Sequence, residues 1–312
     1  MKIVITGGLG HIGSYLIRQF PQQYPNCEII MIDNLVTQRF PSLFNLPTQG
    51  KYKFIEADVT ELDLLPQLVD ANIVIHLAAI TDATSSFEKR DEVEYVNYTA
   101  TKKVVEACAA MEVPLLFPSS TSVYGKQDNQ VDESCNLEDL KPQSPYAETK
   151  LKEESLIQRS VNKLELKAAI FRCGTIFGVS PGMRFHTAVN KFCWQATMGL
   201  PLTVWKTAYK QKRPYLDLSD FYRAASFCME KSLFSGEIYN VVTENLAVKQ
   251  IVEKISSNVK NVEIEFVESE IMNQLSYEVL NTKLLQAGFS TTGDIDSSIK
   301  NTIGLLNQTN SI

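Results

Sequence analysis

The sequence lacks the features of metal-cluster, disulfide-bonded and membrane-spanning proteins. Its six cysteines include no CxxC pair, which argues against a zinc cluster and against a disulfide framework in a chain of this length. No apolar run reaches the length of a membrane span, and the start MKIVITGG has neither the apolar stretch nor the cleavage site of a signal peptide. We therefore expect a cytoplasmic protein with reduced thiols, no bound metal and no membrane partner.

Positive charge is also scarce, since the formal net charge is -6. An acidic chain is a poor general binder of nucleic acid, so we expect no nucleic-acid partner. An anionic ligand would need a local basic site or a set of backbone amides. The 312 residues suffice for one large domain or two coupled ones.

Short apolar runs alternate with helical segments in the first half of the chain. The runs are continuous and rich in β-branched residues, which is typical of strands buried on both faces of a sheet. This alternation predicts an α/β fold with a Rossmann-type, doubly wound parallel sheet. The predicted strands are Ile3–Thr6, Ile29–Ile32, Lys53–Glu56, Ile73–His76, Leu115–Pro118, Ala168–Arg172 and Ile238–Val242. The predicted helices are Glu94–Met111 and Pro145–Ser160, the second with Ser144 as its N-cap.

A glycine-rich turn, Thr6–Gly13, joins the first predicted strand to a helix. Gly7, Gly10 and Gly13 let the backbone approach a pyrophosphate, and the N-terminus of the helix favours its negative charge. Asp33 ends the next strand, where a dinucleotide-binding fold places an acid on the ribose hydroxyls. An acid at this position repels a 2′-phosphate, so the sequence predicts NAD rather than NADP. Asp58, after the third strand, could accept from the adenine amine or be a surface acid without a ligand, and its spacing leaves both interpretations open.

The composition and the periodicity of the sequence change after about Phe171. Residues 173–213 contain many glycines, prolines and aromatic residues with weak periodicity, which indicates a segment that covers a substrate. The tail has helical patterns and one short predicted strand, Val262–Val267. We therefore expect a dinucleotide-binding domain formed by 1–172 with about 214–244, and a substrate-binding domain formed by about 173–213 with 245–312.

A hydroxyl-rich segment and a Tyr-x-x-x-Lys motif carry the predicted chemistry. Ser120 lies near the end of a predicted strand, and ligands bind at the carboxyl ends of strands in an open parallel sheet. Tyr146 and Lys150 share one helix face because they are four residues apart. The Lys150 ammonium and an oxidised nicotinamide would favour the Tyr146 phenolate, which makes Tyr146 a general base or acid. The motif alone also fits two ordinary surface residues, so its weight depends on the other motifs.

Taken in order along the chain, these motifs resemble those of the extended short-chain dehydrogenase/reductases, and among them the nucleotide-sugar epimerases and dehydratases. The resemblance extends over nearly the whole chain. The matching segments are Thr6–Gly13, Ile32–Asn34, Asp58-Val59, His76–Ala79, Asn97, Ser119–Gly125, Ser144–Lys150 and Arg213–Asp220.

This resemblance implies a Rossmann domain that binds NAD, a smaller domain that binds a nucleotide-diphosphate sugar, and a homodimer that pairs the helices 94–111 and 145–160 across subunits. It implies that Ser120 and Tyr146 flank a sugar hydroxyl and that Lys150 holds the nicotinamide ribose. The implied cofactor-binding residues are Gly7, Gly10, His11, Ile12, Asp33, Asn34, Asp58, Val59, Leu77, Ala78, Ala79, Asn97, Ser119, Tyr146 and Lys150. The implied substrate-binding residues are Thr121, Ser122, Thr175, Arg184, Asn190 and Arg213.

The chain departs from its relatives at three places. The resemblance implies that dehydratases have Thr-Asp-Glu at the positions where this chain has Ser120-Thr121-Ser122. The acid pair that expels a hydroxyl is therefore absent from this chain. Many epimerases have an asparagine where Thr175 stands, and a frequent histidine is replaced by Asp217. We therefore expect an NAD-dependent nucleotide-sugar epimerase that oxidises a hydroxyl transiently and returns the hydride to the opposite face. Dehydratase, decarboxylase or dehydrogenase/reductase chemistry, and a non-catalytic dinucleotide sensor, stay open as alternatives.

A few other polar residues are candidates with plainer interpretations. We expect His76, which is flanked by apolar residues, to be a packed structural residue rather than a catalyst. Arg184 and Arg213 could each pair with a phosphate, although a surface charge explains Arg184 equally well. A solvated loop or a phosphate-binding rim would both account for the basic cluster, which comprises Lys206, Lys210 and Lys212.

Overall fold

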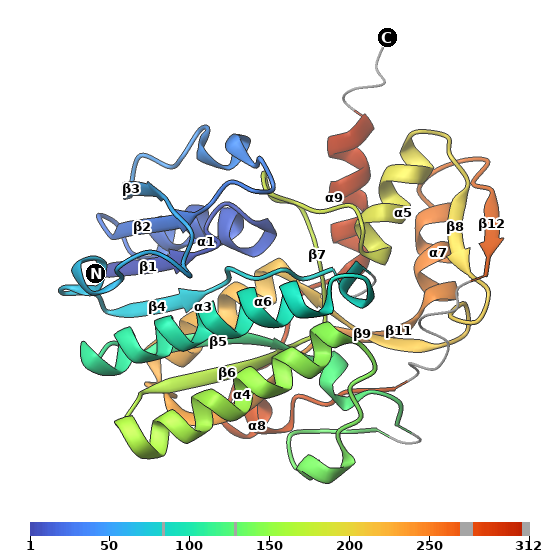
Figure 1. Ribbon diagram of the computed structural model, residues 1–312. Helices are drawn as coiled ribbons and strands as arrows, with labels where there is room; N and C mark the ends of the chain where they lie inside the picture. Colours follow the sequence, from blue (N-terminus) through green and yellow to red (C-terminus); the bar gives the residue numbers. More distant parts are fainter. Residues whose placement is uncertain (83–84, 128–129, 269–276, 308–312) are drawn as a thin grey trace.

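The computed structural model describes residues 1–82, 85–127, 130–268 and 277–307. Its centre is a seven-stranded parallel sheet with the strand order β10-β6-β5-β4-β1-β2-β3 (Figure 1). The strands are β1 (Lys2–Thr6), β2 (Glu28–Asp33), β3 (Lys51–Glu56), β4 (Ile73–His76), β5 (Leu115–Ser120), β6 (Ala168–Cys173) and β10 (Ser235–Val241). The predicted doubly wound parallel sheet is thus confirmed.

Helices cover both faces of this sheet. They are α1 (His11–Gln23), α2 (Leu65–Leu68), α3 (Arg90–Ala110), α4 (Pro145–Leu164) and α6 (Leu218–Glu230). Alternate residues of a strand point to opposite faces, so Ile3 and Ile5 of β1 pack with α1 and α6, whereas Val4 packs with α3 and α4. All three side chains are fully buried. In the part of the chain that the structure describes, no helix is long and apolar enough to cross a membrane.

A smaller unit, at the right of Figure 1, has an apolar cluster of its own. It combines a three-stranded sheet, β11-β9-β7, and a two-stranded sheet, β12-β8, with three helices. Its elements are β7 (Thr175–Phe177), α5 (Ala188–Thr197), β8 (Leu202–Trp205), β9 (Lys212–Asp217), β11 (Glu244–Ala247), α7 (Val248–Ser256), β12 (Ile264–Val267) and α9 (Ile295–Asn307). Phe177, Ile251 and Ile299 are fully buried in its cluster.

Residues that are neighbours in the sequence can pack in different units. Tyr215 of β9 packs in the cluster of the smaller unit, while the neighbouring Leu216 packs in a cluster of the large sheet. Leu284 of α8 (Thr282–Gln286) and the nearby Phe289 also pack in that cluster, because α8 lies against β10. The expected domain division stays a prediction, and within its 245–312 segment Leu284 and Phe289 pack with the large sheet.

One predicted helix end is confirmed, and two others differ from the prediction. Ser144 caps α4 as predicted, since its hydroxyl accepts a hydrogen bond from the first turn at 3.2 Å. The helix α3 begins at Arg90, one turn before the predicted Glu94. The helix α4 continues past the predicted Ser160 and ends at Leu164, where the C-cap Glu165 adopts the left-handed conformation with φ 53°.

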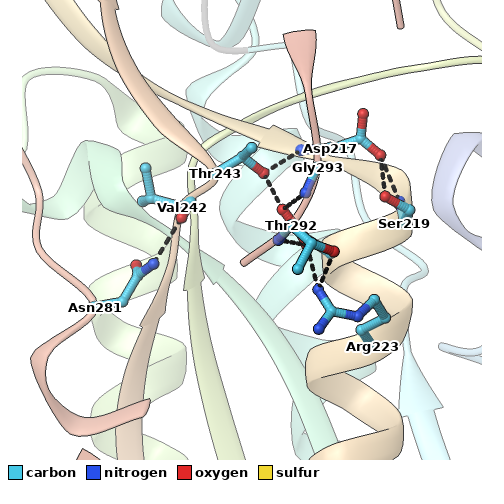
Figure 2. A network of polar contacts seen from close by, with 9 residues as sticks. Asp217, Ser219, Arg223, Val242, Thr243, Asn281, Thr292 and Gly293 are labelled. Atoms are coloured by element: carbon cyan, nitrogen blue, oxygen red, sulfur yellow. Dashed lines mark hydrogen bonds and ion pairs between the residues drawn. The ribbon is translucent and has the colours of Figure 1, made fainter. Parts of the chain in front are cut away.

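A buried carboxylate ties the C-terminal segment to the large sheet (Figure 2). Asp220 of α6 is fully buried and accepts a hydrogen bond from the Thr243 hydroxyl at 2.7 Å. It also accepts from the amides of Thr292 and Gly293, both at 2.9 Å. Arg223 donates to the same carboxylate at 2.9 Å and to the Thr292 hydroxyl at 2.6 Å. These bonds compensate a buried charge and fix the segment before α9.

Candidate active site

Close backbone contacts shape the turn between β1 and α1. Gly7 has φ +65°, and a Cβ on it would lie 2.6 Å from the nitrogen of Ala78, in the segment after β4. A Cβ on Gly13 would lie 2.6 Å from the Gly8 carbonyl oxygen, so packing of the turn itself requires both glycines. Gly10 caps α1 without a side-chain acceptor, which leaves the first amides of α1 able to bind an anion.

Asp33, at the end of β2, holds this turn through its carboxylate. One oxygen accepts a hydrogen bond from the Leu9 amide at 3.1 Å, and the other accepts from the Leu35 amide at 3.0 Å. The side chain is half-buried, and each oxygen keeps a second lone pair for a hydroxyl donor.

Asn34 and Asp58 form a polar pair across the ends of β2 and β3. The Asn34 amide donates to Asp58 at 2.9 Å, and the Thr60 amide donates to the other Asp58 oxygen at 2.8 Å. Burial raises the pKa of Asp58, but the hydrogen bonds from Thr60 and Asn34 outweigh it, so that the pKa is lowered overall. Val59 is buried in the apolar core, so only its backbone can reach a ligand.

The half-buried segment Leu77–Ala79 is pinned against the glycine turn. Leu77 donates from its amide to the Thr6 carbonyl at 2.9 Å, and Ala78 donates to the Thr6 hydroxyl at 3.3 Å. The Asn97 side chain of α3 binds both backbone groups of Ile80, at 2.8 and 2.9 Å. This fully buried side chain supports the segment, and its expected contact with a cofactor stays a prediction.

Residues 178–186, here named the strap, cross the glycine turn. His11 bonds the Gly178 carbonyl through Nε2 at 2.8 Å, and the Ser180 hydroxyl donates to the His11 carbonyl at 2.9 Å. Burial lowers the pKa of His11 to about 3, so its imidazole is neutral. The side chain of His11 therefore holds the strap, and its backbone amide is the group left for a cofactor.

Gly182 brings the strap into direct contact with the turn. Its amide donates to the Ser14 hydroxyl at 2.9 Å, and the Arg39 side chain donates to its carbonyl. A Cβ at this position would lie 2.2 Å from the Leu9 carbonyl oxygen. The sequence shows the motif that contains Gly182, but no local pattern reveals its contact with residues 9–14.

The end of β5 carries hydroxyl groups and no acid. The Ser120 hydroxyl accepts hydrogen bonds from the Ser122 amide at 3.1 Å and from the Ser122 hydroxyl at 2.8 Å. Thr121 is buried and donates to the Cys173 carbonyl of β6 at 3.2 Å. Thr175, at the start of β7, follows directly on that strand and pairs with β9.

Tyr146 and Lys150 lie close together on α4, as predicted. The Lys150 ammonium is 5.9 Å from the centre of the Tyr146 ring and 4.4 Å from the centre of the Phe117 ring of β5. Burial raises the pKa of Tyr146, Lys150 and Arg184 lower it, and the net shift is upward. In the protein without a cofactor, burial therefore outweighs the predicted lowering of the Tyr146 pKa by Lys150. The charge of a nicotinamide does not contribute in that state.

Glu153 is a buried partner of Lys150 that sequence reasoning missed. Its carboxylate lies 3.2 Å from the Lys150 ammonium, and both side chains are at most 4% exposed. Burial would lower the pKa of Lys150, but Glu153 and then Tyr146 raise it above its ordinary value. The helical spacing of three residues could have suggested this pair, but exposed pairs have the same spacing.

Glu154, the next residue, serves a different partner. It forms a buried ion pair with Arg172 of β6 at 2.7 Å and accepts a hydrogen bond from the Ser119 hydroxyl at 2.5 Å. The hydrogen of the Ser119 hydroxyl is thereby used, so this side chain could meet a cofactor only as an acceptor. This pair fastens α4 to β5 and β6.

Arg184 reaches the Tyr146 side of the site from the strap. Its side chain donates to the Thr81 hydroxyl, and its buried Nε has no hydrogen-bond partner among the described residues. Asn190 donates to the Arg184 carbonyl at 3.0 Å and accepts from the Gly178 amide at 3.4 Å. Asn190 is fully buried and supports the strap, and its expected contact with a substrate stays a prediction.

Arg213 lies on β9 and acts electrostatically on Tyr277, which is buried and whose phenol also bonds Thr121. Sequence reasoning missed Tyr277 because no motif surrounds it. Two lysines of the neighbouring basic cluster form ion pairs. Lys206 pairs with Glu268, and Lys212 pairs with Glu278.

Asp217, which replaces a histidine of the relatives, has a structural role. Its carboxylate caps α6 by accepting from the Ser219 amide at 2.7 Å, and it accepts from the Ser298 hydroxyl of α9 (Figure 2 shows the first contact). His76 is buried and bonded to Thr6 and Thr101, so its predicted structural role is confirmed. Over the described residues, no group of three or more histidine, cysteine or acidic side chains could hold a metal ion.

Comparisons with known proteins agree with the motifs. Residues 3–241 match the model of the NAD dependent epimerase/dehydratase family. The chain is 28% identical to dTDP-D-glucose 4,6-dehydratase of Bos taurus, over 97% of this chain and 87% of that protein. It is also 28% identical to an uncharacterized UDP-glucose epimerase of Bacillus subtilis, over 82% of this chain and 81% of that protein.

A solved structure gives the same result for the fold. UDP-glucuronic acid 4-epimerase from Bacillus cereus, in complex with UDP-glucuronic acid and NAD, superposes with a TM-score of 0.85 at 25% identity. The match covers 99% of this chain and all of that one. Both epimerases and dehydratases thus stand among the similar proteins.

Proposed function

The chain belongs to the NAD dependent epimerase/dehydratase family, and on this premise we propose that it is an epimerase of a nucleotide-diphosphate sugar. The observation that carries the proposal is the end of β5, which packs on the helix of Tyr146 and Lys150 and has the hydroxyls of Ser120, Thr121 and Ser122 in place of acids. Dehydration needs an acid that protonates the departing hydroxyl. Glu153 is a carboxylate that acts on Tyr146, and it is buried and paired with Lys150.

The residues around the glycine turn fit NAD by their chemistry. The uncapped amides of α1 suit the diphosphate, and the half-buried Asp33 suits the ribose hydroxyls and disfavours a 2′-phosphate. We assign the remaining cofactor contacts to the backbone of Leu77–Ala79 and to Asn34 and Asp58. NAD, when bound, supplies the acceptor and donor of a hydride.

Tyr146 is the residue that we assign to proton transfer. As the phenolate it takes the proton of a sugar hydroxyl, and as the phenol it returns that proton at the end of the cycle. Ser120 hydrogen-bonds the same sugar oxygen, and the Lys150 ammonium favours the phenolate by its charge. Inversion then requires that the oxidised sugar presents its other face before the proton and hydride return.

Two arginines give the site positive charge for an anionic substrate. Arg184 is half-buried with an unpartnered Nε and acts on Tyr146, so we assign it to the part of the substrate nearest the reaction. Arg213, which lies on β9 and acts electrostatically on Tyr277, is assigned to the nucleotide part. Thr121, Ser122 and Thr175 would complete the sugar pocket.

The test is product analysis on a panel of UDP-, dTDP-, GDP- and CDP-sugars. We expect a product of unchanged mass with one inverted carbon by NMR, and no net NADH. Loss of water or carbon dioxide by mass, or stoichiometric NADH, would replace epimerisation by dehydration, decarboxylation or net oxidation. Bound NAD without any turnover of the panel would favour a dinucleotide sensor.

We also propose a homodimer through α3 and α4, as expected from the resemblance. A groove between these helices is lined by Glu94 and Tyr98 of α3 and by Leu151, Lys152 and Arg159 of α4. Tyr95 beside it is 65% exposed, so its ring is accessible to a second subunit. Light scattering of the wild type and of Tyr95→Glu tests this, with a dimer expected for the first and a monomer for the second.

A further inference from the structure

A chain of buried side chains leads from Lys150 to the glycine turn. Glu153 accepts a hydrogen bond from the Thr101 hydroxyl of α3 at 2.5 Å, and Thr101 bonds His76 Nε2 at 3.2 Å. His76 Nδ1 bonds the Thr6 hydroxyl of β1 at 2.6 Å. All five residues are nearly inaccessible to solvent, with exposed fractions of 3% or less. Four elements, α4, α3, β4 and β1, thus meet in one polar path.

The hydrogen bonds of this path all run in one direction. The Ala78 amide donates to the Thr6 hydroxyl, so that hydroxyl can donate onward to His76 Nδ1. His76 then carries its proton on Nε2 and donates to Thr101, which donates to Glu153. Each donor points toward the Glu153 carboxylate, and bonds aligned in this way strengthen one another. The path therefore holds the carboxylate in one place.

Glu153 is also the one negative charge that faces Lys150 at neutral pH among the described residues. Burial lowers the pKa of His76 to about 3, so that ring is neutral. Burial raises the pKa of the Cys173 thiol on β6 and that of the Tyr146 phenol, so both keep their protons. Arg184 faces Tyr146 with a positive charge. The ammonium of Lys150, buried at 3% exposure, thus depends on Glu153 for compensation.

We propose that Glu153 is a positioning residue, which keeps the Lys150 ammonium charged and fixed beneath Tyr146. A buried amine without an anionic partner loses its proton readily, and a neutral Lys150 could not favour the Tyr146 phenolate. Glu153 acts through Lys150, and the Thr101–His76–Thr6 path acts through Glu153. This inference rests on the proposed function for its catalytic meaning, although the charge of Lys150 can be measured without it.

The first experiment measures Lys150 itself, by NMR of the full-length protein labelled with 13C-lysine and titrated with alkali. The Lys150 signal is identified by its absence in Lys150→Met. We expect Glu153→Gln to lower the titration midpoint of Lys150 by about 1–3 pH units. An unchanged midpoint in a folded Glu153→Gln protein would overturn the proposal.

Glu154→Gln is the matched control. It removes the adjacent buried carboxylate of the same helix, which pairs with Arg172 instead. We expect it to lower stability and to leave the midpoint of Lys150 within a few tenths of a unit of the wild type. An equal shift in both variants would mean that a general loosening of α4, rather than the contact with Glu153, controls Lys150.

Glu153→Asp is the variant to use if Glu153→Gln does not fold. It keeps the charge but withdraws it by one methylene, so we expect a smaller downward shift of the Lys150 midpoint than in the glutamine variant. A midpoint equal to that of the wild type would overturn the claim that the position of the carboxylate matters.

The second experiment links the charge to turnover on the sugar that the product analysis identifies. In Glu153→Gln the alkaline limb of the kcat profile should move to lower pH, with KM nearly unchanged, and Glu153→Asp should restore part of the range. A shifted Lys150 midpoint without turnover of any sugar would leave Glu153 in its role and refute the proposed function. Turnover of a sugar with an unshifted Lys150 midpoint would support the proposed function and refute the role of Glu153.

Discussion

On the β1–β2 side of the candidate site, glycines and backbone amides set the geometry, whereas on the α4 side buried charged side chains set it. Gly7 and Gly13 are required because neighbouring backbone leaves no room for a Cβ, and Asp33 is bonded to a backbone amide of the turn. Lys150 instead stands between Glu153 and the rings of Tyr146 and Phe117. The first side depends on shape and the second on charge.

The difference teaches which substitutions each side should tolerate. A substitution that removes a charge and keeps the shape of the side chain leaves a site made of backbone groups intact. In a buried ion pair the same kind of substitution leaves the partner charge buried and uncompensated. An added methyl group does the opposite, since it collides with backbone that cannot move cheaply. The following predictions test this contrast.

Tyr146→Phe should have the largest effect, because it removes one hydroxyl at the reacting position and leaves the packing unchanged. We expect kcat to fall by about a hundredfold to ten-thousandfold, with the fold and the bound cofactor retained. Turnover on the identified sugar and the cofactor content of the purified protein are the two measurements. Tyr24→Phe, at the far end of α1, is the control and should keep full activity. Full activity of Tyr146→Phe would refute proton transfer by this residue.

Glu154→Gln should lower stability more than any change on the glycine side. It leaves the Arg172 guanidinium buried and unpaired, which costs about 3–5 kcal/mol of unfolding free energy. Urea unfolding measures this loss. The double variant Glu154→Gln with Arg172→Met should recover part of it, because no buried charge is left. A loss below about 1 kcal/mol would show that charge matters less on the α4 side than the contrast requires.

Gly7→Ala should reduce stability by about 2–4 kcal/mol, through its positive φ and the collision with the Ala78 amide. Gly10→Ala is the matched change, since Gly10 has φ -67° and a Cβ there would lie 3.2 Å from a single carbonyl oxygen. We expect Gly10→Ala to cost less than about 1 kcal/mol and to weaken NAD binding instead. Equal unfolding losses in the two variants would remove the distinction between packing glycines and ligand-facing ones.

The two buried histidines give a smaller effect that depends on pH. The folded pKa values of His11 and His76 are about 3, below the ordinary value of 6.5. Their contribution is therefore complete above pH 6.5 and is lost progressively as the pH falls from 6.5 toward 3. Each histidine should cost about 2 kcal/mol of unfolding free energy between pH 6.5 and pH 5. His76→Gln, whose amide does not titrate, should lose less than the wild type over this interval in urea titrations; an equal loss would contradict the buried neutral state.

Sequence reasoning recovered the parts of the molecule that local patterns encode. The strand runs, the turn at Gly7, the N-cap Ser144 and the pair Tyr146 and Lys150 all follow from spacing within a few residues. Several residues expected at a ligand also bind protein. Asn97, Asn190 and the side chains of His11 and Ser119 hold loops or charges in place, and a motif shared by a family does not distinguish support from contact.

The features that could not be predicted all join distant segments. Glu153 looks like any surface glutamate in sequence, and its burial follows only from the packing of α3 on α4. Tyr277 reaches Thr121 from a tail without motifs. The helix α8 packs on the large sheet because Leu284 finds an apolar surface there, which periodicity in a five-residue helix cannot reveal.

The contact of the strap with the glycine turn has a consequence for kinetics. Gly178, Ser180 and Gly182 bind His11 and Ser14, so the strap and the start of α1 move as one body while these bonds last. We expect detachment of the strap to limit how fast a nucleotide on this turn can exchange. A protein built in this way would keep one cofactor molecule through many cycles of turnover, as a reaction that returns its hydride requires.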